Sequence, residues 1–184
     1  MSNKLYLDCY AGISGDMFVA ALLDLGASEE ILAEALETLP VQGFKIKVSR
    51  VIKSGLDACD FNVILDEEHE NYDHDMEYLY GRESHHNHFE GRHEHRGLEE
   101  INGIIDRAAI TEGAKKIARK IFDILAVAEG KAHGVDKEFV HFHEVGAVDS
   151  IVDIIAAAVC LDNLNIKEVI ISWKAILMTA AEKH

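Results

Sequence analysis

The sequence predicts an α/β protein: a mixed-sheet α/β sandwich that carries a mobile histidine-rich insertion. Apolar residues alternate with polar ones at 4–10, 44–49 and 59–65, as they do in half-buried strands. Longer apolar stripes that begin with capping residues indicate helices between and after these strands. Because strands and helices do not alternate as regular βαβ units, a mixed sheet is favoured over a purely parallel one.

The N-terminal elements are predicted in chain order from their boundary residues. The strand at 4–10 is followed by a helix for which Ser14 is a candidate N-cap and which ends at Gly26. Ser28 is a candidate N-cap for a second helix, which ends before Pro40. The next two strands are joined by a turn at 53–55, which predicts a β-hairpin with one face in solvent.

Residues 66–97 interrupt this pattern. They hold ten acidic residues, three arginines and seven of the eleven histidines, without a helical or strand period. Such a segment buries too little apolar surface to offset the entropy of ordering it. We therefore expect a mobile loop inserted into the fold.

The C-terminal half is predicted to be mainly helical. The helix at 147–164 is apolar nearly all round, so we expect it to be central. In order, the elements are a short helix at 98–105, a longer helix from Thr111 to Gly134, a brief strand at 139–143, the helix at 147–164 and a buried strand at 168–172.

Composition excludes several classes of function. With 33 acidic and 18 basic residues, the net charge is −15, which disfavours nucleic acid or an anionic membrane as partner and favours cations. The three isolated cysteines argue against a disulfide framework, and no segment reads as a signal or a membrane span. We expect a soluble, cytoplasmic protein. GxSxG, HExxH and GxGxxG motifs are absent, so serine, kinase and dinucleotide mechanisms have no support.

A first candidate site lies at residues 8–17, between the first strand and the first helix. Gly12 and Gly15 would let the backbone approach a ligand, and the helix N-terminus offers N–H groups to an anion. Asp8 and Asp16 could hold a metal ion beside a bound phosphate. The alternative is a tight turn with Ser14 as N-cap, and the spacing alone leaves both open.

A second candidate site lies at residues 140–153. His141 and His143 would project to one side of a strand, and Asp149 and Asp153 are four residues apart on one helix face. Imidazole and carboxylate groups together suit nickel, zinc, manganese or iron. Asp153 lies among apolar neighbours, and a buried carboxylate needs a partner. A metal site is therefore favoured over simple capping and ion pairing.

The insertion is a third candidate. Its histidines are loosely spaced among acids and could bind divalent ions without fixed geometry, or the segment could be only a solvated acidic linker. The histidines are His69, His74, His85, His86, His88, His93 and His95.

The two motifs at 5–17 and 140–153, with a histidine-rich insertion between them, closely resemble the LarC-type nickel insertion proteins. The resemblance implies a nickel chelatase that matures the lactate racemase cofactor. Such proteins insert nickel into pyridinium-3,5-bisthiocarboxylic acid mononucleotide, with CTP hydrolysis and a divalent ion such as manganese or magnesium. It also implies that residues 1–172 are the family's N-terminal domain and that 173–184 are an atypical tail.

Set beside this family, the sequence lacks the C-terminal nucleotide-binding domain, so CTP binding is not carried over and a C-terminal half is expected as partner. The resemblance implies a nickel site formed by His141, His143 and Glu144 with Asp149 or Asp153. Asp8 and Asp16 would then flank the substrate or a second ion, with Gly12, Ser14 and Gly15 toward a phosphate. Two other hypotheses remain: a nickel-binding chaperone or storage module, and a metal-dependent hydrolase.

Overall fold

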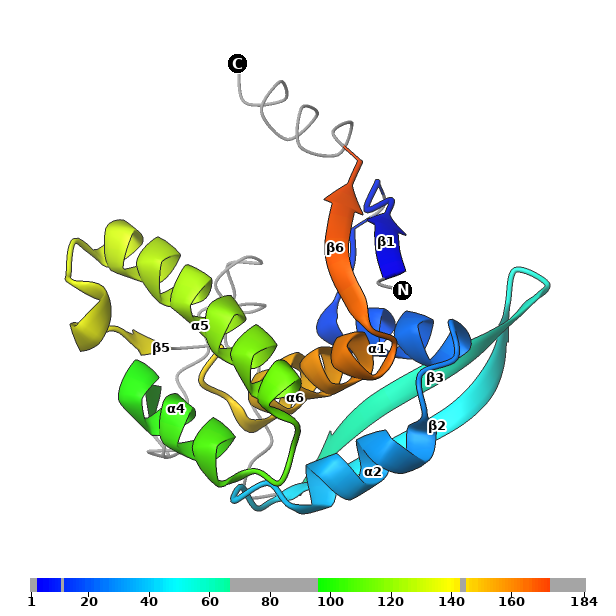
Figure 1. Cartoon of the computed structure of the whole chain (residues 1–184), viewed down its shortest axis with the longest axis horizontal. Coiled ribbons are helices and arrows are strands. Elements are labelled where there is room, and N and C mark those ends of the chain that lie inside the picture. The colour runs from blue at the N-terminus through cyan, green and yellow to red at the C-terminus, as the bar shows by residue number, and fades with distance from the viewer. Residues whose placement is uncertain (1–2, 11, 67–95, 143–144, 173–184) are drawn as a thin grey trace, which may run out of the picture.

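The computed structural model describes residues 3–10, 12–66, 96–142 and 145–172, and it confirms the α/β prediction (Figure 1). Within these residues the strands form three separate two-stranded sheets. The elements are β1 (Asn3–Leu7), α1 (Gly15–Asp24), α2 (Glu29–Glu37), β2 (Phe44–Lys53), β3 (Leu56–Leu65), β4 (Arg96–Gly97), α4 (Leu98–Arg107), α5 (Glu112–His133), a 3₁₀ turn (Lys137–Phe139), β5 (His141–Phe142), α6 (Val148–Asn163) and β6 (Ile166–Ile171).

Helix α6 is the centre of the core, as its apolar sequence predicts. Ten of its sixteen residues are buried, among them Ile151, Val152 and Ile155. The helices α1, α2 and α5 all pack against it, and Figure 1 shows them arranged around it. A helix surrounded in this way has a nearly fixed position, so a polar group on it is held firmly relative to its neighbours.

All three predicted residues occupy N-cap positions, and two of them make a side-chain capping bond. The Ser28 hydroxyl accepts a hydrogen bond from the Ile31 N–H at 3.2 Å, and the Thr111 hydroxyl accepts one from the Ala114 N–H at 3.1 Å. Ser14 occupies the N-cap position of α1 but makes no capping bond, because its hydroxyl donates to the Asp16 carboxylate instead. Ser14 is therefore the N-cap residue of α1, as predicted, but its side chain does not make the capping bond.

The predicted hairpin is confirmed as β2 paired antiparallel with β3. Ser54 and Gly55 both have positive φ in its two-residue turn, which suits the twist of the strands. The hairpin is joined to α1 by Asp24, which forms an ion pair with Arg50 and accepts a hydrogen bond from the Cys59 N–H at 2.8 Å. These two bonds lower the pKa of Asp24 below its usual value.

The strand predicted at 168–172 forms as β6, but the prediction that it is buried is wrong. It pairs parallel with β1, and the side chains of Val169, Ile170 and Ile171 are 43%, 43% and 47% exposed. They are exposed because, within the part of the chain that the structure describes, the sheet has only these two strands.

The insertion ends earlier than predicted. Residues 96 and 97 form β4, which pairs antiparallel with β5, and Arg96 is buried. The strand predicted at 139–143 is correspondingly short and follows a 3₁₀ turn. Residues 67–95 and 173–184 lie outside the described residues, so the expectations of a mobile loop and an atypical tail stay untested. No helix among the described residues is long and apolar enough to cross a membrane.

Candidate functional site

The two sequence motifs meet where the N-terminus of α1 packs against the middle of α6. Gly15 lies directly on Asp153: a Cβ atom at Gly15 would be 2.5 Å from Asp153 Oδ2 and 2.8 Å from Asp153 Cβ. Only glycine allows this approach, because real Cβ contacts are never so short. Gly15 therefore brings the first motif against the carboxylate of the second.

Three carboxylates gather at this junction. The Asp16 backbone N–H donates to the Asp153 carboxyl group, and Asp149 lies one turn before Asp153 on α6. Asp16 Oδ1 also accepts hydrogen bonds from its neighbours Met17 N–H, at 2.8 Å, and Ser14 Oγ. We call Asp16, Asp149 and Asp153 the carboxylate junction.

Two oxygens of the carboxylate junction have no hydrogen-bond partner within the part of the chain that the structure describes. Asp149 Oδ1 and Asp153 Oδ1 are buried and accept no hydrogen bond from any described residue. A buried carboxylate oxygen without a donor is costly, because it has lost water and gained nothing in return. A cation or a proton would satisfy these oxygens.

The pKa of Asp153 also indicates that the carboxylate junction requires a cation or a proton. Burial is the largest cause that raises the pKa of Asp153; together with the charges of Asp16 and Asp149, and against the lowering effect of the Asp16 N–H, it raises this pKa from 3.8 to about 7. Asp153 therefore keeps its proton to a higher pH than an ordinary aspartate does. A bound divalent cation would favour the charged form, as an adjacent positive charge does.

The other residues of the first motif lie at the surface. Asp8 is exposed just after β1, and Gly12 has a φ of +85° with its N–H donating to the Cys9 carbonyl at 3.0 Å. Ser14 is also exposed. The chain therefore makes a tight turn here, as one interpretation predicted, and the role of these residues toward a phosphate stays a prediction.

His141 lies at an exposed position on β5. Its Nδ1 is 3.2 Å from the Phe139 carbonyl, so a proton on Nδ1 would donate to that oxygen and leave the Nε2 lone pair free for a ligand. It also lines a hollow of about 260 Å³ together with Glu129 and His133, whose side chains are 3.7 Å apart. Sequence reasoning did not single out Glu129 or His133, which carry no motif.

The remaining predicted ligands are not part of the described structure. His143, Glu144 and the seven histidines of the insertion lie outside the described residues. Within the described residues, no three His, Cys, Asp or Glu side chains converge closely enough to hold a metal ion by themselves. The carboxylate junction would thus need water or a substrate atom to complete the coordination of an ion.

Arg96 is a supporting residue that the sequence analysis assigned to the insertion. Its guanidinium donates to the Gly146 carbonyl through Nη1 at 2.9 Å and lies 3.3 Å from Glu100 through Nε. Gly146 lies two residues before α6, so Arg96 holds the backbone that leads into the carboxylate junction. In the sequence, the helical apolar period that starts at Leu98 was the signal from which regular structure near Arg96 could have been predicted.

Comparison with known proteins identifies a family. A family model described as nickel insertion protein matches residues 5–177. Three relatives are each named pyridinium-3,5-bisthiocarboxylic acid mononucleotide nickel insertion protein. Those from Alkaliphilus metalliredigens, Geobacillus kaustophilus and Acetivibrio thermocellus are 53%, 44% and 41% identical, over 94%, 90% and 90% of this chain.

The chain spans only 39%, 37% and 37% of the length of these three relatives. More than half of each relative therefore has no counterpart in the sequence described above. No solved structure matches the chain.

Proposed function

Because the chain belongs to the nickel insertion protein family, we propose that it takes part in inserting nickel into pyridinium-3,5-bisthiocarboxylic acid mononucleotide. Nickel is the cargo of this reaction, and the mononucleotide is its acceptor. Since the relatives are more than twice as long, the chain would act together with the part of the family protein that it does not match.

The carboxylate junction is the observation that carries this proposal. Its two buried, unpartnered oxygens and the raised pKa of Asp153 are the features expected of a cation site before the ion arrives. Asp16 comes from one motif and Asp149 and Asp153 from the other. A cation site formed by both motifs would explain why the first motif contains Asp16 and the second contains Asp149 and Asp153.

The carboxylates of the carboxylate junction and the histidines near β5 suit different ions. Carboxylate oxygens with water suit manganese or magnesium, whereas imidazole nitrogens suit nickel. We assign His141, with His143 and Glu144, to receiving nickel, and Asp16, Asp149 and Asp153 to holding the divalent ion or the nickel in transit. The histidines of the insertion would raise the local nickel concentration.

The turn from β1 to α1 would face the mononucleotide. Gly12, Ser14 and Gly15 lie at the N-terminus of α1, where the helix dipole favours a phosphate, while the Asp16 and Met17 N–H groups already donate to carboxylates. Asp8 would lie beside the bound substrate. Residues 8–17 contain no lysine or arginine, so this turn does not suit the triphosphate of CTP, and we assign nucleotide hydrolysis to the part of the relatives that this chain does not match.

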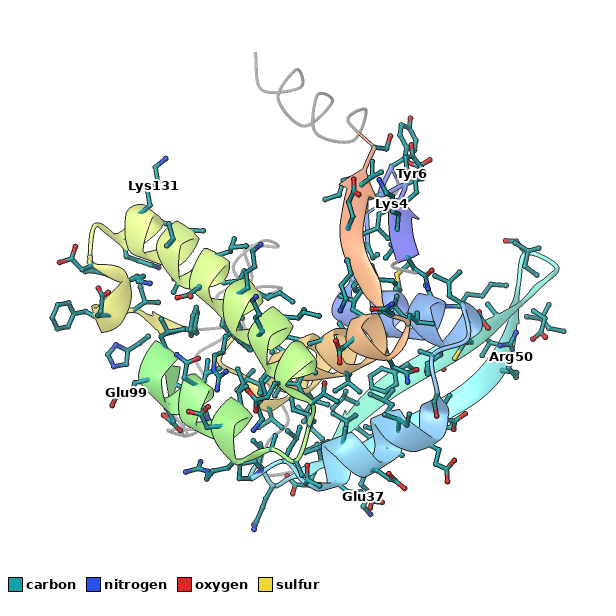
Figure 2. The ribbon with its side chains drawn as sticks, in the orientation of Figure 1. Lys4, Tyr6, Glu37, Arg50, Glu99 and Lys131 are labelled. Atoms are coloured by element: carbon teal, nitrogen blue, oxygen red, sulfur yellow. The ribbon has the colours of Figure 1, made fainter. Side chains whose placement is uncertain are left out.

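The test is nickel transfer to the purified pyridinium mononucleotide, followed by the absorbance of the nickel product. The chain is assayed with and without the unmatched part of the Alkaliphilus metalliredigens relative, with CTP and manganese present. We expect product only with both polypeptides, and at least a tenfold lower rate for Asp149→Asn. Glu37→Gln is the control, because Glu37 lies on the outer side of α2 (Figure 2).

Two other outcomes would contradict the proposal. Nickel that binds tightly but is never transferred, even with the second polypeptide, would make the chain a storage module or chaperone. Turnover of phosphoesters by this chain with manganese alone would make it a metal-dependent hydrolase.

A further inference from the structure

The parallel pair formed by β1 and β6 is unlike the rest of the fold. It extends away from the helices that form the core (Figure 1). Among the described residues, neither strand has a neighbour on its other side, so both edges offer free N–H and C=O groups. Leu5 in the middle of β1 and Ile166 at the start of β6 are buried, and Leu7 packs partly against the core, whereas Tyr6, Val169, Ile170 and Ile171 stay exposed.

Both faces of this pair are apolar toward its far end. The register places Tyr6 beside Ile170 on one face, where their side chains are 65% and 43% exposed. The opposite face carries Val169 and Ile171, next to Leu5 and Leu7 on β1. Only the ion pair of Lys4 with Glu168, at 2.7 Å, gives the first face a polar character, and Figure 2 shows Lys4 and Tyr6 on β1 beside β6.

A two-stranded parallel sheet with exposed apolar faces is unusual in a folded protein. Parallel strands occur almost only in sheets that are covered on both faces, and their sequences are then apolar on both sides. An isolated two-stranded sheet is marginally stable in water. The run of Val169, Ile170 and Ile171 therefore fits the interior of a larger sheet.

We propose that this pair is the docking surface for the part of the family protein that the chain does not match. That part would add a strand to an open edge and cover the Tyr6–Ile170 face and the Val169–Ile171 face with apolar side chains. The unmatched 61% of the Alkaliphilus metalliredigens relative supplies ample chain for this. The inference rests on the proposed function in that the partner is the remainder of a nickel insertion protein.

The test measures association without any metal or substrate, so it is independent of whether nickel is transferred. The full chain is titrated with the purified unmatched part of that relative, and the dissociation constant and the mass of the complex are recorded. The variants are Ile170→Lys and Tyr6→Lys on one face and Val169→Lys on the other. Ile52→Lys is the matched control, because Ile52 is 80% exposed at the end of the β-hairpin.

We expect a one-to-one complex, at least tenfold weaker binding for each sheet variant, and a change below twofold for Ile52→Lys. Melting temperatures check that the variants stay folded, and either face variant alone suffices if the other unfolds. The proposal is overturned if no complex forms or if all four variants bind alike. It is also overturned if the chain forms a dimer that the sheet variants disrupt, because a second copy would then cover the face.

Discussion

Asp153 shows how one buried side chain can connect stability, pH and ion binding. Its pKa of about 7 in the folded protein lies above its ordinary value of 3.8, so between these values the folded state binds more protons than the unfolded state. The free energy of unfolding therefore falls as pH rises from about 4 to about 7, and it stays lower above that range.

Replacing Asp153 by Asn should remove this penalty in the metal-free protein. A pKa that moves from 3.8 to about 7 corresponds to about 4 kcal/mol, so we expect Asp153→Asn to be more stable than the parent at pH 8, by up to that amount. The difference should shrink as pH falls toward 4. Urea unfolding between pH 5 and pH 8 measures it, with Glu37→Gln as control, and parallel pH profiles for Asp153→Asn and the parent protein would refute the raised pKa.

The sequence identified Asp153 because its neighbours Val152, Ile154 and Ile155 are apolar, and a carboxylate in such surroundings needs a partner. The sequence could not identify Asp16 as one of its neighbours, because that contact depends on how α1 crosses α6. Arg96 was missed for a related reason. Its burial comes from the long-range bond to Gly146, which no local pattern records.

At the scale of elements, the close contact of α1 with α6 depends on Gly15, which has no side chain. A methyl group at Gly15 would clash with Asp153 Cβ as well as with its carboxylate, so rotating the side chain cannot relieve the overlap. We expect Gly15→Ala to lower the free energy of unfolding by about 1–3 kcal/mol.

Gly103 on α4 provides the control for this substitution. It has nothing within 4 Å of an added Cβ, so Gly103→Ala should raise the free energy of unfolding by about 0.5–1 kcal/mol through helix propensity. Thermal unfolding of both variants gives the comparison. Equal effects would mean that α1 does not approach α6 as closely as described.

Element boundaries were predictable where a local signal exists. Ser28, Thr111 and Gly134 are found at the helix ends where their chemistry predicts them, and alternation located the hairpin. The exposure of β6 was not predictable, since an apolar strand looks the same in sequence whether or not its cover is present. The short strands β4 and β5 exist only through their mutual pairing.

At the scale of the whole molecule, the boundary at Arg96 separates two kinds of deletion. Residues 67–95 have no apolar period to contribute to a core, so replacing them by a short Gly-Ser linker should preserve the fold and lower the number of nickel ions bound. Removing 66–97 should cost stability as well, because it deletes the buried Arg96. Equilibrium dialysis with nickel and thermal melts distinguish the two effects, and an unchanged nickel stoichiometry would exclude a nickel-gathering role for the insertion.

The central claim is that Asp153 holds a divalent ion where the two motifs meet, with the charges of Asp16 and Asp149 favouring the cation and with water or substrate atoms completing its coordination. Calorimetric titration of the full chain with manganese at pH 7.5 tests it most directly, because manganese favours carboxylates over the histidines. The account predicts one site whose affinity falls at least tenfold in Asp153→Asn and in Asp16→Asn, and is unchanged in Glu37→Gln. Equal manganese affinity in all four proteins would contradict it.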